Sequence, residues 1–213
     1  MWAPLIAYKR KGVPELIVYG AVSWVSDQRI LHQYGGDAEI FGRSLVKPFQ
    51  MKVLTKELDA VLSIPEKAIS LASHNGEEKH VRIAQSILDD ANRSYLQTPE
   101  SLPLVPKEGS KKEKNRWLHC CSGKHAAIIK GCLEKDWRVT DYISAKHPYH
   151  QEFIRRIQKY FGHHWQPRVT AQDGCNMPTV TFAMSQLAHL FSWLVVEKKQ
   201  DWIWQAMTRY PDL

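Results

Sequence analysis

The chain has 213 residues, of which 44% are hydrophobic, and this length fits one domain with a buried core. No apolar run approaches the roughly 20 residues that a membrane-spanning helix needs. The charges at the N-terminus follow its short apolar stretch, which is the reverse of a secretory signal. We therefore expect a single-domain cytoplasmic protein without a membrane partner.

The net charge of +7 raises the question of a nucleic-acid partner. Much of the excess lies in "VPKEGSKKEKNR", residues 105–116, which mixes Lys with Glu and has no aromatic side chain to stack on bases. We interpret this segment as a solvated loop and expect no nucleic-acid partner. A basic nucleic-acid-binding module stays an alternative, and steep salt dependence of binding would reveal it.

Strand-forming sequences occupy the first forty residues. "APLIAY" and "ELIVYGAVSWV" are rich in β-branched and aromatic side chains, and "ILHQYGG" follows the polar turn "SDQR". This order predicts an antiparallel meander that leads the chain to Ser44.

Helical signals dominate the remainder of the chain. Ser63 to Glu66 form a capping box with a proline just inside it, which predicts a helix from about Pro65 to the Asn75-Gly76 stop. Further helices are expected at 77–91, 122–136, 147–162 and 200–210, a short strand at 168–174, and a long apolar helix that Pro178 opens. The order predicts an α+β fold, an antiparallel sheet flanked by helices. So few strands make a narrow sheet, which we expect to be incomplete.

The stretch "GRSLVKPFQ" places Ser44 three residues before Lys47. Near a helix start these two side chains share a face, and a lysine held away from water loses part of its preference for the charged form. Such a lysine could take the serine proton. Pro48 disfavours helical geometry at Lys47, so regular helix could begin only at Pro48. A helix start with a solvated lysine stays the alternative interpretation.

Three further stretches combine polar side chains with turns. In "ASHNGEEKH", Ser73 and His74 precede a turn, a position more typical of caps than of catalysts, and Glu77 favours the following helix start. In "HCCSGKHAA", Ser122 is the expected N-cap and Gly123 would let the backbone approach a ligand closely.

Cysteines occur in two of these stretches. Cys121, Lys124 and His125 would crowd around one helix start, and the turn at Asp173 in "QDGCNMP" presents Cys175. Two cysteines at polar turns could share a soft metal such as zinc, although their spacing matches no zinc-finger pattern.

The four stretches together change the interpretation. R-S-x-x-K-P-x-Q, S-H-x-x-E-x-x-H, C-S-G-K-H and D-G-C-N-x-P, in this order, resemble the rhizobial-type (thermolabile) L-asparaginase family, asparaginase II. The resemblance spans nearly the whole chain. It implies a fold similar to serine β-lactamases and glutaminases, and hydrolysis of L-asparagine, a small-molecule substrate, to aspartate and ammonia.

The resemblance also implies roles for individual residues. Ser44 would be the nucleophile, Lys47 its base and Ser73 a second active-site hydroxyl. A Zn²⁺ ion, with no organic cofactor, would be held at the positions of Cys121, Lys124 and Cys175. The side chains expected around the substrate are Arg43, His74, Glu77, His125, Asp173 and Asn176.

One departure from the family concerns length. Family members continue with a glycine-rich segment and a second lysine, in a K-x-G-A-like motif, that pairs with the serine corresponding to Ser73. We therefore expect a C-terminally truncated member. The alternatives are a truncated, inactive remnant that binds a ligand or partner, and another Ser-Lys acyl transferase acting on a β-lactam or peptide amide. Eight tryptophans and an unfinished sheet edge favour self-association, such as a homodimer.

Overall fold

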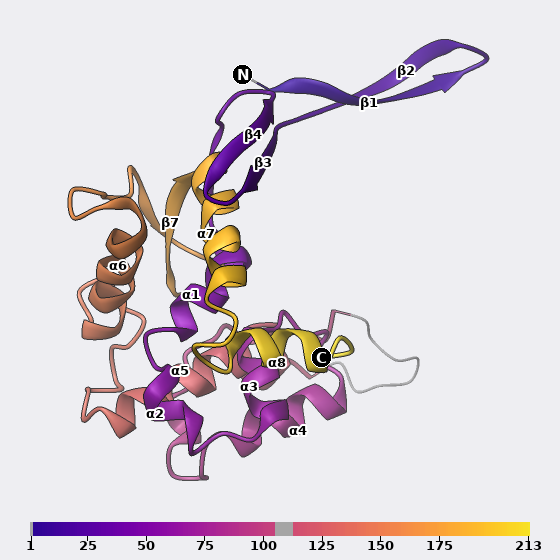
Figure 1. Cartoon of the computed structure of the whole chain (residues 1–213). Helices are drawn as coiled ribbons and strands as arrows, with labels where there is room; N and C mark the ends of the chain where they lie inside the picture. The colour runs from indigo at the N-terminus through magenta and orange to yellow at the C-terminus, as the bar shows by residue number, and fades with distance from the viewer. Residues whose placement is uncertain (1, 105–112) are drawn as a thin grey trace.

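The computed structural model describes residues 2–104 and 113–213 (Figure 1). Most of the segment expected to form a basic loop, residues 105–112, lies outside the described residues. The described chain combines helices with small antiparallel sheets, and none of these sheets closes on itself, so the α+β prediction is confirmed. In the described part, no helix is both long enough and apolar enough to cross a membrane.

The strands form three separate antiparallel sheets. Their bounds are β1 (Ala3–Arg10), β2 (Val13–Gly20), β3 (Val22–Ser26), β4 (Arg29–Tyr34), β5 (Glu39–Phe41), β6 (Thr170–Gln172) and β7 (Pro178–Ala183). β1 pairs with β2, β3 pairs with β4, and β7 lies between β5 and β6. The predicted meander is thus wrong as one continuous sheet, because the chain turns at Ala21 and starts a second hairpin.

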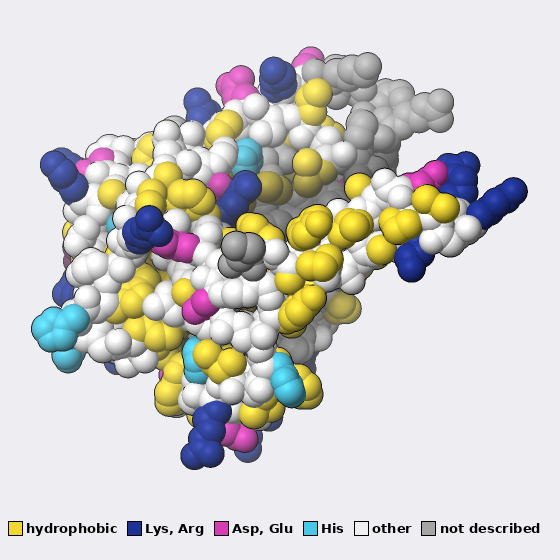
Figure 2. Space-filling model, turned by 90° about the horizontal axis from the view of Figure 1, so that it is seen from above, with side chains coloured by type: hydrophobic (Ala, Val, Ile, Leu, Met, Phe, Trp, Pro, Cys, Tyr) yellow, Lys and Arg dark blue, Asp and Glu magenta, His cyan; other side chains and the backbone are white. Residues whose placement is uncertain are grey.

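The β1–β2 hairpin projects from the body as a two-stranded ribbon (Figure 1). Hydrophobic side chains line it in the view from above (Figure 2). Among them, Val13 is 66% exposed and Leu16 is 56% exposed. The ribbon therefore contributes little to the hydrophobic core of the chain.

Helices build the body. Their bounds are α1 (Lys47–Met51), α2 (Thr55–Asp59), α3 (Ile64–Leu71), α4 (Glu78–Ser86), α5 (Ser122–Glu134), α6 (Pro148–Phe161), α7 (Met184–Val196) and α8 (Ile203–Arg209), with 3₁₀ turns η1 (Arg43–Val46), η2 (Arg93–Tyr95) and η3 (Arg116–Leu118). The capping box is confirmed, since the Ser63 backbone N–H donates to Glu66 at 2.8 Å. The predicted end of α6 is confirmed at Gly162, whose φ is +93°.

The prediction that Pro178 opens a helix is wrong. Residues Pro178–Ala183 form the central strand β7, and α7 begins at Met184. β7 is buried on both faces from Pro178 to Phe182, so its sequence lacks the alternation that marks a half-exposed strand. Short buried strands and buried helices cannot be separated by periodicity alone.

Helix α5 runs through the hydrophobic core, with Ile128 and Ile129 fully buried. Its first turn packs closely on α3, since a Cβ atom at Gly123 would lie 2.6 Å from the Ile69 carbonyl oxygen. Gly123 thus permits close helix packing, where the sequence suggested close approach of a ligand. The consequence is a rigid platform for the side chains at the start of α5.

Candidate active site

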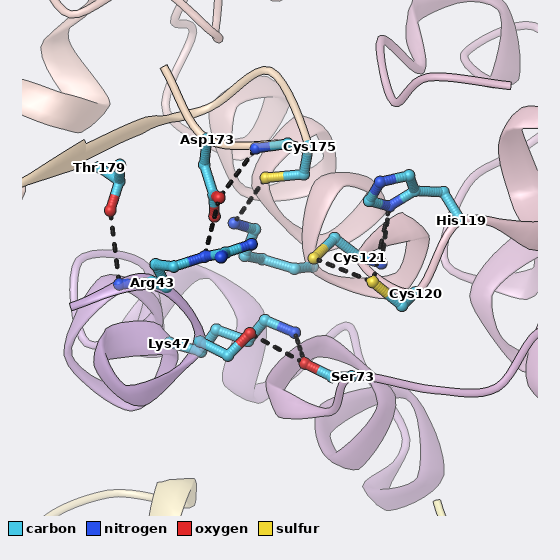
Figure 3. Close-up of polar contacts among 12 residues, drawn as sticks. Arg43, Lys47, Ser73, His119, Cys120, Cys121, Asp173, Cys175 and Thr179 are labelled. Carbon is cyan, nitrogen blue, oxygen red and sulfur yellow. Dashed lines mark hydrogen bonds and ion pairs between the residues drawn. The ribbon is translucent and has the colours of Figure 1, made fainter. Parts of the chain in front are cut away.

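Two hydroxyls and one amine form a continuous chain of contacts (Figure 3). Ser44 lies in η1, Lys47 begins α1 and Ser73 follows α3. Ser44 Oγ lies 3.0 Å from Ser73 Oγ, and Lys47 Nζ donates to Ser73 Oγ at 2.8 Å and to the Ala72 carbonyl. The described contacts therefore join Ser44 to Lys47 through Ser73.

The backbone before Ser44 is strained. Arg43 has a φ of +43°, in the left-handed region that residues with a side chain rarely adopt. Such a conformation costs on the order of 1–3 kcal/mol and persists only where the surroundings enforce it. Here Pro48 at the start of α1 follows, and regular helix begins only after the 3₁₀ turn, as the sequence allowed. This irregular turn is what presents Ser44 toward Ser73.

Lys47 is buried beneath the two hydroxyls. Its residue is 1% exposed, whereas Ser44 and Ser73 are both exposed. Burial lowers the pKa of Lys47, and nearby Lys124 lowers it further, while the thiols of Cys121, Cys120 and Cys175 act in the opposite direction. The amine is thus biased toward its neutral, proton-accepting form, next to hydroxyls that a substrate can reach.

An ion pair joins the Ser44 turn to the segment before β7. Arg43 Nε lies 3.1 Å from Asp173 Oδ1, and the Arg43 backbone N–H donates to Thr179 Oγ1 at 3.4 Å. Asp173 Oδ1 also accepts the Gly174 backbone N–H at 2.8 Å. These contacts bring two stretches more than a hundred residues apart into one site.

Cysteines and a lysine lie beside this chain of contacts. Cys121 and Cys175 are both buried, and Lys124 Nζ donates to Cys175 Sγ at 3.4 Å. Contact with Cys121 and burial raise the pKa of the Cys175 thiol. Cys121 takes the N-cap position of α5; Ser122, predicted as the cap, is the first helical residue and donates to the Trp117 carbonyl at 2.9 Å.

His125 lies beneath the thiols and is fully buried. Its Nδ1 contacts the Tyr142 hydroxyl at 2.7 Å, and burial lowers its pKa to about 4, against a smaller opposing effect of Cys175. Its Nε2 is buried beside that thiol without a well-oriented hydrogen bond to any described residue. Buried ring nitrogens normally have a hydrogen-bond partner, so this atom marks a polar position next to Cys175.

Three predicted substrate-binding side chains make contacts that hold turns. His74 Nε2 lies 2.9 Å from Ser122 Oγ, and burial lowers the pKa of His74 to about 3. Glu77 caps α4 reciprocally with His80. Asn176 Nδ2 donates to the Gln97 carbonyl at 2.8 Å. The structure thus gives Arg43, Asp173 and His125 places in the site and gives these three side chains contacts at its margins.

Sequence reasoning missed two residues of the site. Cys120 Sγ lies 3.9 Å from Cys121 Sγ, and His119 Nδ1 accepts the Cys121 backbone N–H at 3.0 Å. The signal was three consecutive side chains with metal-binding atoms, His-Cys-Cys, directly before a helix start.

Comparison with protein-family models gives one match, to L-asparaginase II, over residues 6–213. The matched region contains all four stretches that converge here. A search of curated proteins finds no significant match.

Proposed function

The chain belongs to the L-asparaginase II family, and we propose that it hydrolyses the side-chain amide of L-asparagine to L-aspartate and ammonia through an ester on Ser44. Membership of the family supports asparagine hydrolysis in general. The observation that carries the finer proposal is the unbroken contact from Ser44 through Ser73 to the buried amine of Lys47.

Acylation begins with the neutral amine of Lys47. Ser44 Oγ attacks the amide carbon, its proton passes to Ser73, and the Ser73 hydroxyl proton passes to Lys47 Nζ. The tetrahedral adduct then collapses with cleavage of the C–N bond. The proton returns through Ser73 to the leaving nitrogen, which departs as ammonia and leaves the aspartyl ester on Ser44.

Deacylation uses the same groups with water as the nucleophile. Water adds to the ester carbon as its proton passes to Lys47 through Ser73, and the C–O bond to Ser44 breaks with return of that proton to Ser44 Oγ. General-base help of this kind accounts for roughly 10²–10⁴ in rate. Exposure of both hydroxyls allows substrate and water to reach the reacting carbon.

The charged ends of asparagine match the ion pair beside Ser44. The Arg43 side chain is 68% exposed, so its guanidinium can bind a carboxylate while it keeps its contact with Asp173. Guanidinium groups bind carboxylates in a two-point geometry. The Asp173 carboxylate can accept hydrogen bonds from the substrate ammonium group. We assign recognition of the amino-acid end of the substrate to this pair.

The thiols and the amine of the site fit a zinc ion. Cys121, Cys175 and Lys124 would hold it, and Lys124 Nζ already lies 3.4 Å from Cys175 Sγ. Sulfur and nitrogen donors are the set that zinc prefers. When bound, zinc would polarise nearby substrate groups and neutralise thiolate charge near Lys47. Loss of that negative charge would further favour the neutral amine.

The direct test is ammonia release from L-asparagine by the purified chain, with L-glutamine as a second substrate. Ser44→Ala should abolish release, and Ser94→Ala, at an exposed serine in η2, should leave it unchanged. Rapid quenching and mass spectrometry of the active chain should detect the aspartyl ester on the peptide that contains Ser44. Turnover that survives Ser44→Ala would overturn the assigned nucleophile, and absence of release from the unaltered chain would favour a ligand-binding role.

A further inference from the structure

A pocket distinct from the hydrolytic site is formed by α2, α6, the end of α7 and the segment that follows it. Its volume is about 410 Å³, within the range of small-molecule sites in proteins. The described residues that line it include none that the hydrolytic mechanism uses. Helix α1 connects the two sites, because Lys47 begins this helix and Lys52, which lines the pocket, directly follows its end.

The two acidic side chains of the pocket are already paired. Lys52 Nζ lies 2.7 Å from Asp201 Oδ2 and 3.1 Å from Glu197 Oε2. Glu197 Oε2 also accepts the Tyr160 hydroxyl at 2.9 Å. Asp201 Oδ1 accepts the Ile203 backbone N–H at 3.0 Å. The Lys52 side chain is only 7% exposed, so this network forms the buried side of the pocket.

Three further cations line the pocket on its more exposed side. Lys56 of α2 and Lys159 of α6 are exposed, and neither forms an ion pair with any described residue. Arg156 precedes Lys159 by three residues and so shares its face of α6. Its Nε lies 3.7 Å from Glu152 Oε1, too far for a hydrogen bond, and no other described group accepts this N–H. The pocket therefore carries positive charge that its own acids do not neutralise.

A phosphate group matches this arrangement. Four cations and two carboxylates line the pocket, which leaves an excess of two positive charges. A phosphate monoester carries about two negative charges at neutral pH, and its oxygens accept hydrogen bonds from several ammonium and guanidinium groups at once. We propose that the pocket binds the phosphate group of a small molecule, held by Lys56, Arg156 and Lys159. The inference does not depend on the proposed hydrolysis of asparagine.

Trp193 of α7 offers a surface for the remainder of such a ligand. Its half-buried ring lines the pocket, with its centroid 6.1 Å from that of Tyr160. Planar rings stack on aromatic side chains of this kind. Two sources of phosphate are therefore to be distinguished. Inorganic pyrophosphate would use the cations alone, whereas a nucleotide would also stack its base on Trp193.

The test is calorimetric titration of the full chain with pyrophosphate and, separately, with ADP. Pyrophosphate should bind saturably, and Lys56→Gln and Lys159→Gln should each raise its Kd by about fivefold, because each removes one cation from the pocket. Lys9→Gln removes the same charge from the projecting ribbon (Figure 1) and should change the Kd by less than about twofold. All three side chains are exposed, so the variants should fold normally.

The two probes distinguish the sources: a lower Kd for ADP would identify a nucleotide, and equal values would identify inorganic phosphate. Absence of saturable binding of either probe would overturn the inference, as would equal Kd values for Lys159→Gln and the unaltered chain. Arg43→Gln completes the set, because Arg43 is the exposed cation of the hydrolytic site. Loss of pyrophosphate binding in Arg43→Gln, with binding retained in Lys159→Gln, would place the anion at the hydrolytic site and refute the assignment.

Discussion

In most proteins apolar side chains are buried and amines are exposed. The β1–β2 ribbon and the site formed by Ser44, Ser73 and Lys47 each depart from one half of this rule. The ribbon exposes apolar side chains such as Val13 and Leu16, whereas the site buries the amine of Lys47. In the site, hydrogen bonds to Ser73 and Ala72 compensate the buried amine. In the ribbon, cross-strand hydrogen bonds hold two strands together while the apolar side chains gain little burial. The buried amine of Lys47 serves the proposed hydrolysis, whereas the exposed apolar side chains of the ribbon lie outside the core.

The largest expected effect concerns buried lysines. Lys47→Met should lower kcat for asparagine by roughly 10²–10⁴, because the proton acceptor is lost. Lys67 offers a matched control, since it is also buried but donates to Asp59 at 2.7 Å, away from the hydroxyls. Lys67→Met should retain kcat within about threefold in protein that is folded at the assay temperature. Similar losses of kcat in both variants would show that burial, and not proton transfer, explains the effect.

Apolar side chains of the two regions should differ in stability. Ile128→Ala in α5 should lower the free energy of unfolding by about 2–5 kcal/mol, since it leaves a cavity in a closed core. Leu16→Ala in the ribbon should change it by less than about 0.5 kcal/mol, because that side chain is 56% exposed. Urea titrations followed by tryptophan fluorescence measure both values. A large loss on Leu16→Ala would mean that the ribbon packs against something in solution.

Ion pairs of the body and of the ribbon should also differ in their contribution to the free energy of unfolding, with a smaller effect than the apolar side chains. Lys52 Nζ lies 2.7 Å from Asp201 and 3.1 Å from Glu197, with a 7% exposed side chain. Lys52→Met should cost about 1–3 kcal/mol of unfolding free energy, below the range for fully buried pairs because the carboxylates are partly solvated. Arg10→Met removes the exposed pair with Glu15 on the ribbon and should cost no more than about 1 kcal/mol. Equal costs in urea unfolding would contradict the contrast.

The smallest expected effect is pH dependence from a buried histidine of α6. Burial lowers the pKa of His150 to about 4, against about 6.5 in the unfolded chain. Between these values the unfolded state binds more protons, so stability falls as the pH is lowered through this window. The unaltered chain should lose about 1 kcal/mol more than His150→Gln between pH 7 and pH 5.5. Parallel pH profiles of the two proteins would rule out this role for His150.

Local features of the fold could be predicted from sequence because their causes are local. The Ser63–Glu66 capping box and the Gly162 end of α6 each depend on a few neighbouring residues. Strand β7 was missed because its side chains are buried on both faces, which removes the period of two. The division of the first strands into separate hairpins was missed because strand propensity does not specify which strands pair.

The convergence of the predicted segments could be anticipated from the sequence, but the contacts between their side chains could not. The spacing of Ser44 and Lys47 and the cysteine stretches pointed to segments that the structure brings together. That Ser73 stands between Ser44 and Lys47 depends on a contact between the end of α3 and η1, which no local pattern encodes. The position of Cys120 likewise depends on how the chain turns just before α5.

The layering of exposed hydroxyls over a buried amine has a consequence for covalent reagents. Electrophiles that approach from solvent meet the side chains at positions 44 and 73 first, while the nitrogen of Lys47 is covered by protein on nearly all sides. Sulfonyl fluorides and boronic acids should consequently label or occupy serine oxygen, and acylating reagents selective for amines should pass over this lysine in favour of those on the surface. The fold thus makes the proposed proton acceptor the group that inhibitors find hardest to touch.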